Sequence, residues 1–370
     1  MMSPTVSTTD LNYTIAMLLI LGGVFLYQRY VDYHAIVNHP HYDGPASAKK
    51  LPRTWNYSDV MLDSDEQIRQ HLDNVRRGNG PDLNKPLLWI HVEREWNARR
   101  WSHFFERGSN DINQPYLYLT IKSIADQCGD DFNIVILDDD SFANLLPNWN
   151  VDMERVGDPV KSHMRRLALA QLLHQYGGLT LPPSTICVHN LLEMHRHGIS
   201  KGRTMYMGQF ANTSHYRFPE TRMDGDQNFK VEPAIMGCAP KSPAMLRLVK
   251  FLEMQQASDH SNETDFKDSC SAFCTEMFHS GLMHVIDGRM IGTRTANNKV
   301  VTIHELMGSS YVKFDTPSLY CIHVPHKELL AMPKHSWFAY VSVADVLRSE
   351  TIIGNWLALG LGGLGGSAPQ

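Results

Sequence analysis

The chain has 370 residues, of which 43% are hydrophobic and 20% are charged, and its formal net charge is -5. This composition is that of an ordinary globular protein, long enough to bury one large core or two modest ones. The acidic balance and the scattered Lys and Arg residues give no basic footprint, so nucleic acid is excluded as an expected partner.

An uncharged apolar run, LNYTIAMLLILGGVFLY, occupies residues 11–27. A helix that spans a bilayer needs about 20 apolar residues, and Tyr27 and Tyr30 can complete the span at the headgroup level. A secretory signal peptide is the alternative, but no basic region precedes the run and no A-x-A-like site follows it. We therefore expect residues 1–10 to be a short tail and residues 11–30 to be a single-pass membrane anchor.

The charges that flank this run predict its orientation. Asp10 precedes it, and basic residues follow it: Arg29, Lys49, Lys50 and Arg53. Because basic residues favour the cytoplasmic side, we expect the folded body on that side of the membrane. Asn-x-Ser/Thr sequons at 56–58, 212–214 and 262–264 would be usable only in the opposite orientation.

The cysteines agree with a reducing compartment. There are six of them, without the CxxC pairs of a structural zinc site: Cys128, Cys187, Cys238, Cys270, Cys274 and Cys321. We expect reduced, buried thiols. Cys270 and Cys274 lie four residues apart, on one face of a predicted helix, and would need further ligands to hold a metal. Cys321 lies close to His323 and His326 in a strand-like context, which favours a core or rim role.

Three segments follow the anchor. Residues 31–85 are rich in His, Pro, Asp, Asn and Gly and are expected to form a stalk or wrapping arm. Residues 86–356 form the folded body, in which strands and helices alternate. Residues 357–370 are Gly-rich and uncharged, which is typical of a mobile tail.

Within the body, buried strands are predicted at 87–92 and 132–137, with a helix from Pro115 between them. This alternation favours a parallel sheet covered by helices. The further strands that the sequence predicts are 179–181, 186–188, 204–208, 231–238, 284–286 and 299–303. The further predicted helices are 142–146, the segment from Pro159 to Gly177, 243–253 and 266–279.

Paired acids suggest possible metal ligands. Asp138 and Asp140 follow the strand at 132–137 and form a D-x-D at a strand end, although short acids at this place are also expected to cap the next helix. Asp224 and Asp226 form a second D-x-D, in an Asp-Gly turn where solvated acids are common.

Several motifs occur in a characteristic order: KPLLWIH at 85–91, IKSI at 121–124, ILDDD at 136–140, LLHQYGG at 172–178 and IGT at 291–293. Together they resemble the capsular-polysaccharide-synthesis and DxD sugar-binding glycosyltransferases, and most of all members encoded by large DNA viruses of algae. The resemblance implies a GT-A-like nucleotide-diphospho-sugar transferase fold. This fold is α/β, with a mostly parallel sheet, helices on both faces and the donor at the strand carboxyl ends.

The metal-binding acids of that family are absent. In the family, the strand after Y-G-G ends in D-x-D or D-A-T, whose carboxylate holds a divalent cation against the diphosphate of the donor. Here these positions fall on Pro182 and Ser184. The acid of the S-D-x-x-R motif is also replaced, by His163. We therefore expect no metal cofactor, and no catalytic residue can be assigned.

Basic residues offer a substitute for the cation. Lys161, Arg165 and Arg166 follow Pro159 in a predicted helix and could neutralise a diphosphate directly. A solvated helix face is the simpler explanation, because most Lys and Arg side chains are exposed.

Two hypotheses remain. In the first, the chain is a membrane-tethered, non-catalytic scaffold whose partners are the membrane and other protein subunits, for instance at the internal membrane of a large virus particle. In the second, it is an active transferase that uses a nucleotide-sugar, either without a metal or with the acids at 138/140 or 224/226. The loss of the family's acids favours the first hypothesis.

Overall fold

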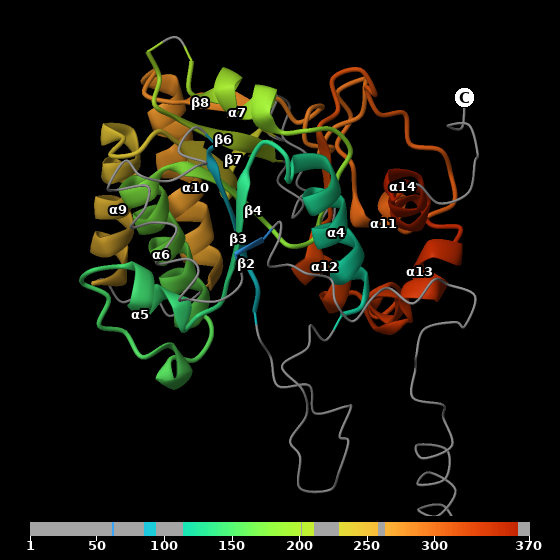
Figure 1. The fold of residues 1–370 in the computed structure, drawn as a ribbon, viewed down its shortest axis with the longest axis horizontal. Helices are drawn as coiled ribbons and strands as arrows, with labels where there is room; N and C mark the ends of the chain where they lie inside the picture. The colour runs from blue at the N-terminus through green and yellow to red at the C-terminus, as the bar shows by residue number, and fades with distance from the viewer. Residues whose placement is uncertain are drawn as a thin grey trace, which may run out of the picture. The chain divides into compact units, whose positions relative to one another are not determined.

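The computed structural model describes residues 61–62, 85–93, 114–200, 202–210, 229–257 and 263–361. All of these belong to one compact unit, Asn56–Gln370. Its described part is built on a mixed seven-stranded sheet of order β1-β3-β2-β4-β7-β6-β8, with helices on both faces (Figure 1). The strand β7 runs antiparallel to β4 and β6, and the other described pairings in this sheet are parallel. The predicted mostly parallel α/β architecture is confirmed.

The strands are β1 (Met61–Leu62), β2 (Leu87–His91), β3 (Asn133–Leu137), β4 (Gly178–Leu181), β5 (Thr185–Cys187), β6 (Met205–Phe210), β7 (Lys230–Cys238), β8 (His284–Ile286) and β9 (Cys321–His323). The helices are α4 (Tyr116–Cys128), α5 (Ser141–Leu145), α6 (Val160–Tyr176), α7 (Leu192–Gly198), α9 (Pro243–Gln256), α10 (Glu263–His279), α11 (Ile303–Leu306), α12 (His326–Ala331), α13 (Val343–Arg348) and α14 (Ile352–Gly360). Strands β5 and β9 form a separate antiparallel pair.

The sheet topology places the ends of several strands at one edge. β2, β3 and β4 are parallel neighbours. β7 is antiparallel to both β4 and β6, so β6 runs in the same direction as β4, and β8 is parallel to β6. The carboxyl ends of these strands therefore meet at one edge, the carboxyl edge, together with the amino end of β7. Ligands of open α/β sheets bind at such edges.

Two hydrophobic cores organise the described part: one packs helices against the seven-stranded sheet, and the other joins α4, the β5/β9 pair and the C-terminal helices. Helices α5, α6, α9 and α10 cover one face, and α4, α12, α13 and α14 lie on the other (Figure 1). In α9 the buried side chains recur at helical spacing, at Met245, Leu248, Val249 and Leu252. Burial of each such side chain stabilises the fold by at most about 1.5–3 kcal/mol, since the unfolded chain already covers part of its apolar surface.

One predicted strand is wrong. Residues 299–303 contain only a bridge between Val300 and Arg294, and helix α11 begins at Ile303. Thr302 and Glu305 form a capping box, in which the Thr302 hydroxyl accepts from the Glu305 amide at 3.3 Å and the Glu305 carboxylate accepts from the Thr302 amide at 2.9 Å. These bonds satisfy the free amides of a helix start and outweigh the strand preference of the valines.

The two ends of the body extend beyond the predicted limits. Met61–Leu62, in the segment predicted as an arm, pairs with β3 as the edge strand β1. At the other end, α14 continues to Gly360, and Leu357, predicted as the start of the tail, is completely buried. The predicted anchor at residues 11–30 lies outside the described residues. No helix in the described part is both long and apolar enough to cross a bilayer.

Candidate functional site

An acidic residue at the carboxyl edge organises the site. Strands β2 and β3 are in register, with His91 opposite Leu137, so the chain beyond β3 passes beside the end of β2. There the His91 Nε2 and Asp139 Oδ1 atoms are 2.9 Å apart. Helix α6 approaches the same place and presents Lys161 and Arg165, which lie one turn apart on one side of the helix.

Arg165 binds Asp139 with two parallel hydrogen bonds. Its Nε donates to Asp139 Oδ1 and its Nη2 to Oδ2, both at 2.7 Å. The remaining Nη1 lies 2.9 Å from Glu93 Oε2, just beyond β2. Lys161 Nζ is 3.7 Å from Asp139 Oδ2. We call His91, Glu93, Asp139, Lys161 and Arg165 the Asp139 cluster. The Arg165 and Asp139 side chains at its centre are only 11% and 17% exposed, whereas Glu93 at its rim is 41% exposed.

The pKa values follow from this geometry. Burial on its own raises the pKa of Asp139, but the hydrogen bonds from Arg165 and His91 outweigh it and hold the pKa well below the usual range. Burial likewise lowers the pKa of Arg165, and the bond to Asp139 and the charge of Glu93 reverse this. Asp139 and Arg165 are therefore both charged, and the positive charges of Lys161 and Arg165 are balanced by Asp139 and Glu93 within the protein.

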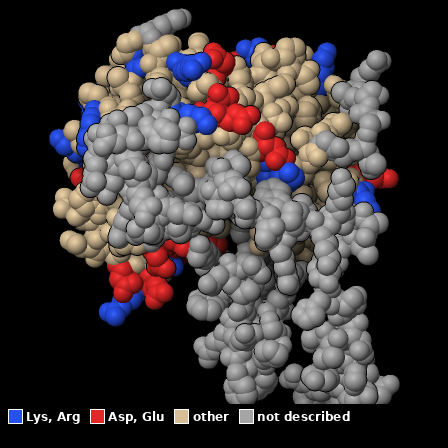
Figure 2. All heavy atoms as spheres, viewed as in Figure 1, with Lys and Arg blue, Asp and Glu red and all other residues tan. Residues whose placement is uncertain are grey.

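The first two residues of α12, His326 and Lys327, also make contacts near the cluster. Tyr116 Oη and His326 Nδ1 are 2.5 Å apart at the start of α12, and burial lowers the pKa of His326 although the charge of Glu93 opposes this. Lys327 Nζ donates to Ser162 Oγ at 3.1 Å, which ties α12 to the start of α6. Figure 2 shows Lys and Arg lying next to Asp and Glu on the described part of the face toward the viewer.

The predicted acid pair at 138/140 plays a different role from the one expected of metal ligands. Asp138 caps α5, because its Oδ1 accepts from the amide of Ser141 at 3.1 Å and from its hydroxyl at 2.8 Å. Asp140 is exposed and makes no capping hydrogen bond, so the capping role expected of it is wrong. The acid that faces the edge is Asp139 between them. His91, Glu93 and Asp139 were missed, although each follows or ends a predicted strand.

The turn at Pro182–Ser184, where the resemblance would place a metal site, is packed against the protein itself. The Ser184 hydroxyl donates to the Val324 carbonyl at 2.8 Å, and Ser184 is only 2% exposed. The Thr120 hydroxyl donates to the Pro183 carbonyl at 2.5 Å, and the Pro182 carbonyl accepts from the amide of Thr185. The Ser184 hydroxyl is therefore engaged by the protein itself.

The remaining candidates lie elsewhere. Arg166 projects from another side of α6 and hydrogen-bonds Cys270; the bond from Cys274, together with Arg166, outweighs burial and lowers the pKa of Cys270. His163 is buried. The pair at 224/226 lies outside the described residues. Among the residues that the structure describes, no group of three or more His, Cys, Asp or Glu side chains is placed to hold a metal ion.

No protein-family model matches the chain, and no curated protein matches it either. Solved structures with a similar arrangement are glycosyltransferases. Mouse xyloside xylosyltransferase 1 is 11% identical over 56% of this chain and 87% of its own, with a TM-score of 0.34. The galactosyltransferase LgtC, solved with donor and acceptor sugar analogues, is 9% identical over 76% of this chain and 97% of its own, also with a TM-score of 0.34. The PaToxG glycosyltransferase is 10% identical over 80% and 95%, with a TM-score of 0.30. At these values the similarity carries no conclusion about activity or substrate.

Proposed function

We propose that this chain is a glycosyltransferase-like protein that does not transfer sugar and serves as a membrane-tethered structural component. One observation carries the proposal: Arg165, the cation best placed to replace a metal, is held by Asp139 and Glu93. A guanidinium in a bidentate bond to a carboxylate has few donors left for a diphosphate. An incoming diphosphate would also meet the two carboxylates, whose charge repels it.

The positions outside the described residues complete the proposal. Residues 11–30 supply the tether, and the part of the predicted arm (31–85) that precedes the edge strand β1 contacts neighbouring subunits. The resemblance to members encoded by large DNA viruses of algae suggests the internal membrane of a virus particle as the assembly, with the folded body on the cytoplasmic side.

Calorimetry with nucleotide-sugars tests the loss of transfer chemistry. The full chain in detergent is titrated with a panel of UDP- and GDP-sugars, with and without Mn²⁺, after circular dichroism has shown that it is folded. We expect no heat of binding from any member of the panel. A Kd at or below about 100 µM, which is about -5.5 kcal/mol, would overturn the proposal.

A substitution at the lost metal site gives an independent test. Ser184→Asp places a carboxylate against the Val324 carbonyl, and we expect a loss of about 2–4 kcal/mol in the free energy of unfolding. The matched variant Ser184→Ala loses only the hydrogen bond and should cost about 1 kcal/mol. If Mn²⁺ raised the melting temperature of Ser184→Asp but not that of Ser184→Ala, the turn would be able to hold a metal once the acid is restored, and its packing would not be what excludes the ion.

A metal-independent transferase is the second candidate function, and the position of two lysines favours it. Lys161, whose side chain is 25% exposed, and the exposed Lys327 both lie beside Ser162 at the start of α6. Under this alternative, a nucleotide-sugar would bind without Mn²⁺, and the double variant Lys161→Met/Lys327→Met would lose that binding while remaining folded.

A further inference from the structure

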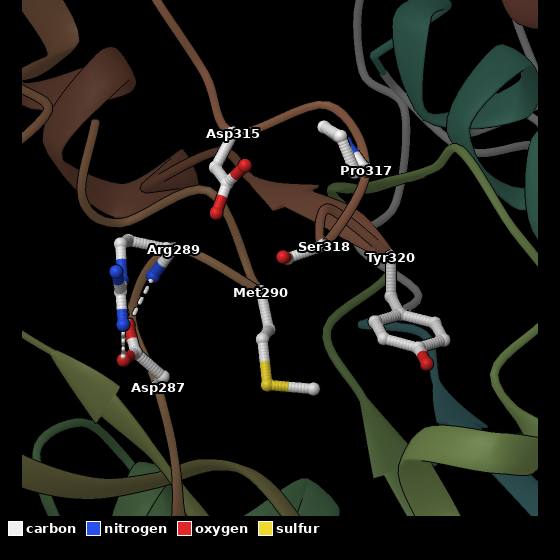
Figure 3. A pocket seen from close by; sticks show the side chains of 7 residues that line it. All are labelled: Asp287, Arg289, Met290, Asp315, Pro317, Ser318 and Tyr320. Carbon is white, nitrogen blue, oxygen red and sulfur yellow. Dashed lines mark hydrogen bonds and ion pairs between the residues drawn. The ribbon is translucent and has the colours of Figure 1, made fainter. Parts of the chain in front are cut away.

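A hollow of about 340 Å³ lies at the carboxyl edge beyond β8, and no residue of the Asp139 cluster lines it. Figure 3 shows its lining from close by. Two loops form it, the loop that follows β8 and the loop that leads into β9. The residues that line it are Asp287, Arg289, Met290, Asp315, Pro317, Ser318 and Tyr320. Its volume is within the range of small-molecule sites in proteins.

Hydrogen bonds between the two loops, and from the loops to neighbouring segments, fix the walls of the hollow. The Tyr320 amide donates to the Met290 carbonyl at 2.8 Å, and the Tyr320 carbonyl accepts from the amide of Val188 at 2.9 Å. The Gly288 amide donates to Gln209 Oε1 at 3.0 Å, which joins the first loop to β6. Because the protein's own groups hold both loops in place, binding would cost little loop ordering.

The polar side chains of the lining differ in how many hydrogen bonds they make. Arg289 turns back to Asp287, with Nη2 2.6 Å from Oδ2 and Nε 3.1 Å from Oδ1 (Figure 3). By contrast, the side chains of Asp315, Ser318 and Tyr320 take part in no hydrogen bond among the described residues, although the charge of Asp315 helps Asp287 to raise the pKa of Arg289. Figure 3 shows the Asp315 carboxylate and the Ser318 hydroxyl turned toward the centre of the group. The lining therefore carries a net negative charge and presents oxygen acceptors.

A protonated amine matches this lining. An ammonium group has three donors and no acceptor, so it can be bound by the Asp315 carboxylate and the Ser318 hydroxyl. The thioether of Met290 and the ring of Pro317 suit the methylene chain that carries the amine, and the ring of Tyr320 attracts a cation. A phosphate would instead be repelled by the net negative charge.

We propose that the hollow between the β8 and β9 loops binds an alkylammonium group, such as that of a lysine side chain or a polyamine. This site is separate from the Asp139 cluster, and it stands whether or not the chain binds a nucleotide-sugar.

Calorimetric titration of the full chain in detergent tests the site. The probes are n-butylamine, spermidine and a short lysine-containing peptide, with n-butanol as the neutral match for n-butylamine. We expect saturable binding of the amines and none of the alcohol. The spermidine and peptide arms distinguish a free polyamine from a protein side chain as the natural source of the group.

Two variants locate the binding. Asp315→Asn keeps the shape of the side chain and removes its charge, and we expect affinity for the amines to fall by at least about tenfold, as for the loss of a charge-assisted hydrogen bond. Asp126→Asn removes a charge from a half-exposed pair with Lys122 in α4 and should leave affinity unchanged. The proposal is overturned if no amine binds, if n-butanol binds as well as n-butylamine, or if both variants bind alike while folded.

Discussion

At the scale of the residue, Arg165 decides the state of the Asp139 cluster. Removing it leaves the Asp139 carboxylate buried beside His91 without its bidentate partner. For Arg165→Met we expect a loss of about 2–4 kcal/mol in the free energy of unfolding at pH 7, measured by urea denaturation. Arg155→Met removes a guanidinium that is 87% exposed and paired with Asp152. This control should cost less than about 1 kcal/mol.

The pH dependence of the difference in unfolding free energy between the native protein and Arg165→Met identifies the cause of that difference. In the native protein the pKa of Asp139 is held below its ordinary value of 3.8, so the stabilisation is present above that value and is lost as the pH falls through the lowered pKa. In Arg165→Met the carboxyl group protonates at a higher pH, which relieves its burial. The gap between the two proteins should therefore shrink as the pH falls below about 4. A gap that stayed constant would mean that Arg165 acts through packing alone.

At the scale of the element, the backbone geometry between α6 and β4 requires glycine at positions 177 and 178, whether or not an acid follows β4. Gly177 ends α6 with φ at 76°, and its carbonyl accepts from the indole of Trp89 at 2.9 Å. A Cβ atom at Gly178 would lie 2.2 Å from the Leu87 carbonyl oxygen in the neighbouring strand β2. The motif is required by the packing of β4 on β2, whatever the strand carries at its far end.

Gly178→Ala tests this account. We expect it to cost more than about 4 kcal/mol or to prevent folding, since both the backbone and the neighbouring strand oppose the methyl group. Gly202→Ala is the matched control, because Gly202 has a positive φ of 78° but nothing within 4 Å of an added Cβ. It should cost only about 1–2 kcal/mol. Thermal denaturation followed by circular dichroism measures both, and equal losses would show that backbone strain alone limits Gly178.

At the scale of the whole molecule, the body keeps all of its thiols inside. The six cysteines are free and buried, as the sequence predicts. Burial raises the pKa of Cys187, Cys238 and Cys321. Since the thiolate is the reactive form and a reagent needs access, the native thiols should be inert.

Titration with Ellman's reagent checks the packing around the buried cysteines, three of which lie in the first core. The native chain should show no fast reaction, and the denatured chain should release a signal for six thiols. Met254→Cys, at a position that is 65% exposed on α9, should add a single fast thiol in the native state. A fast thiol in the unvaried native protein would show that one of the cores opens, with Cys270 first to be suspected because its pKa is lowered.

The sequence by itself determined the features that depend on near neighbours. The alternation of strands and helices, the end of α6 at a glycine pair and the buried cysteines follow from hydrophobic period and from the conformational limits of single residues. The absence of acids at Pro182 and Ser184 is also readable from the sequence once the motif before them is aligned.

Only the tertiary structure decided which side chains meet. Successive residues of a helix project about 100° apart, so Arg165 joins Asp139 while its neighbour Arg166 joins Cys270. After β3, the direction in which each side chain projects likewise lets Asp139, and not Asp138 or Asp140, bind Arg165. The partner of Ser184 lies 140 residues further along the chain. Such pairs depend on how α6, β3 and β9 pack together, and that packing cannot be predicted from a local pattern of residues.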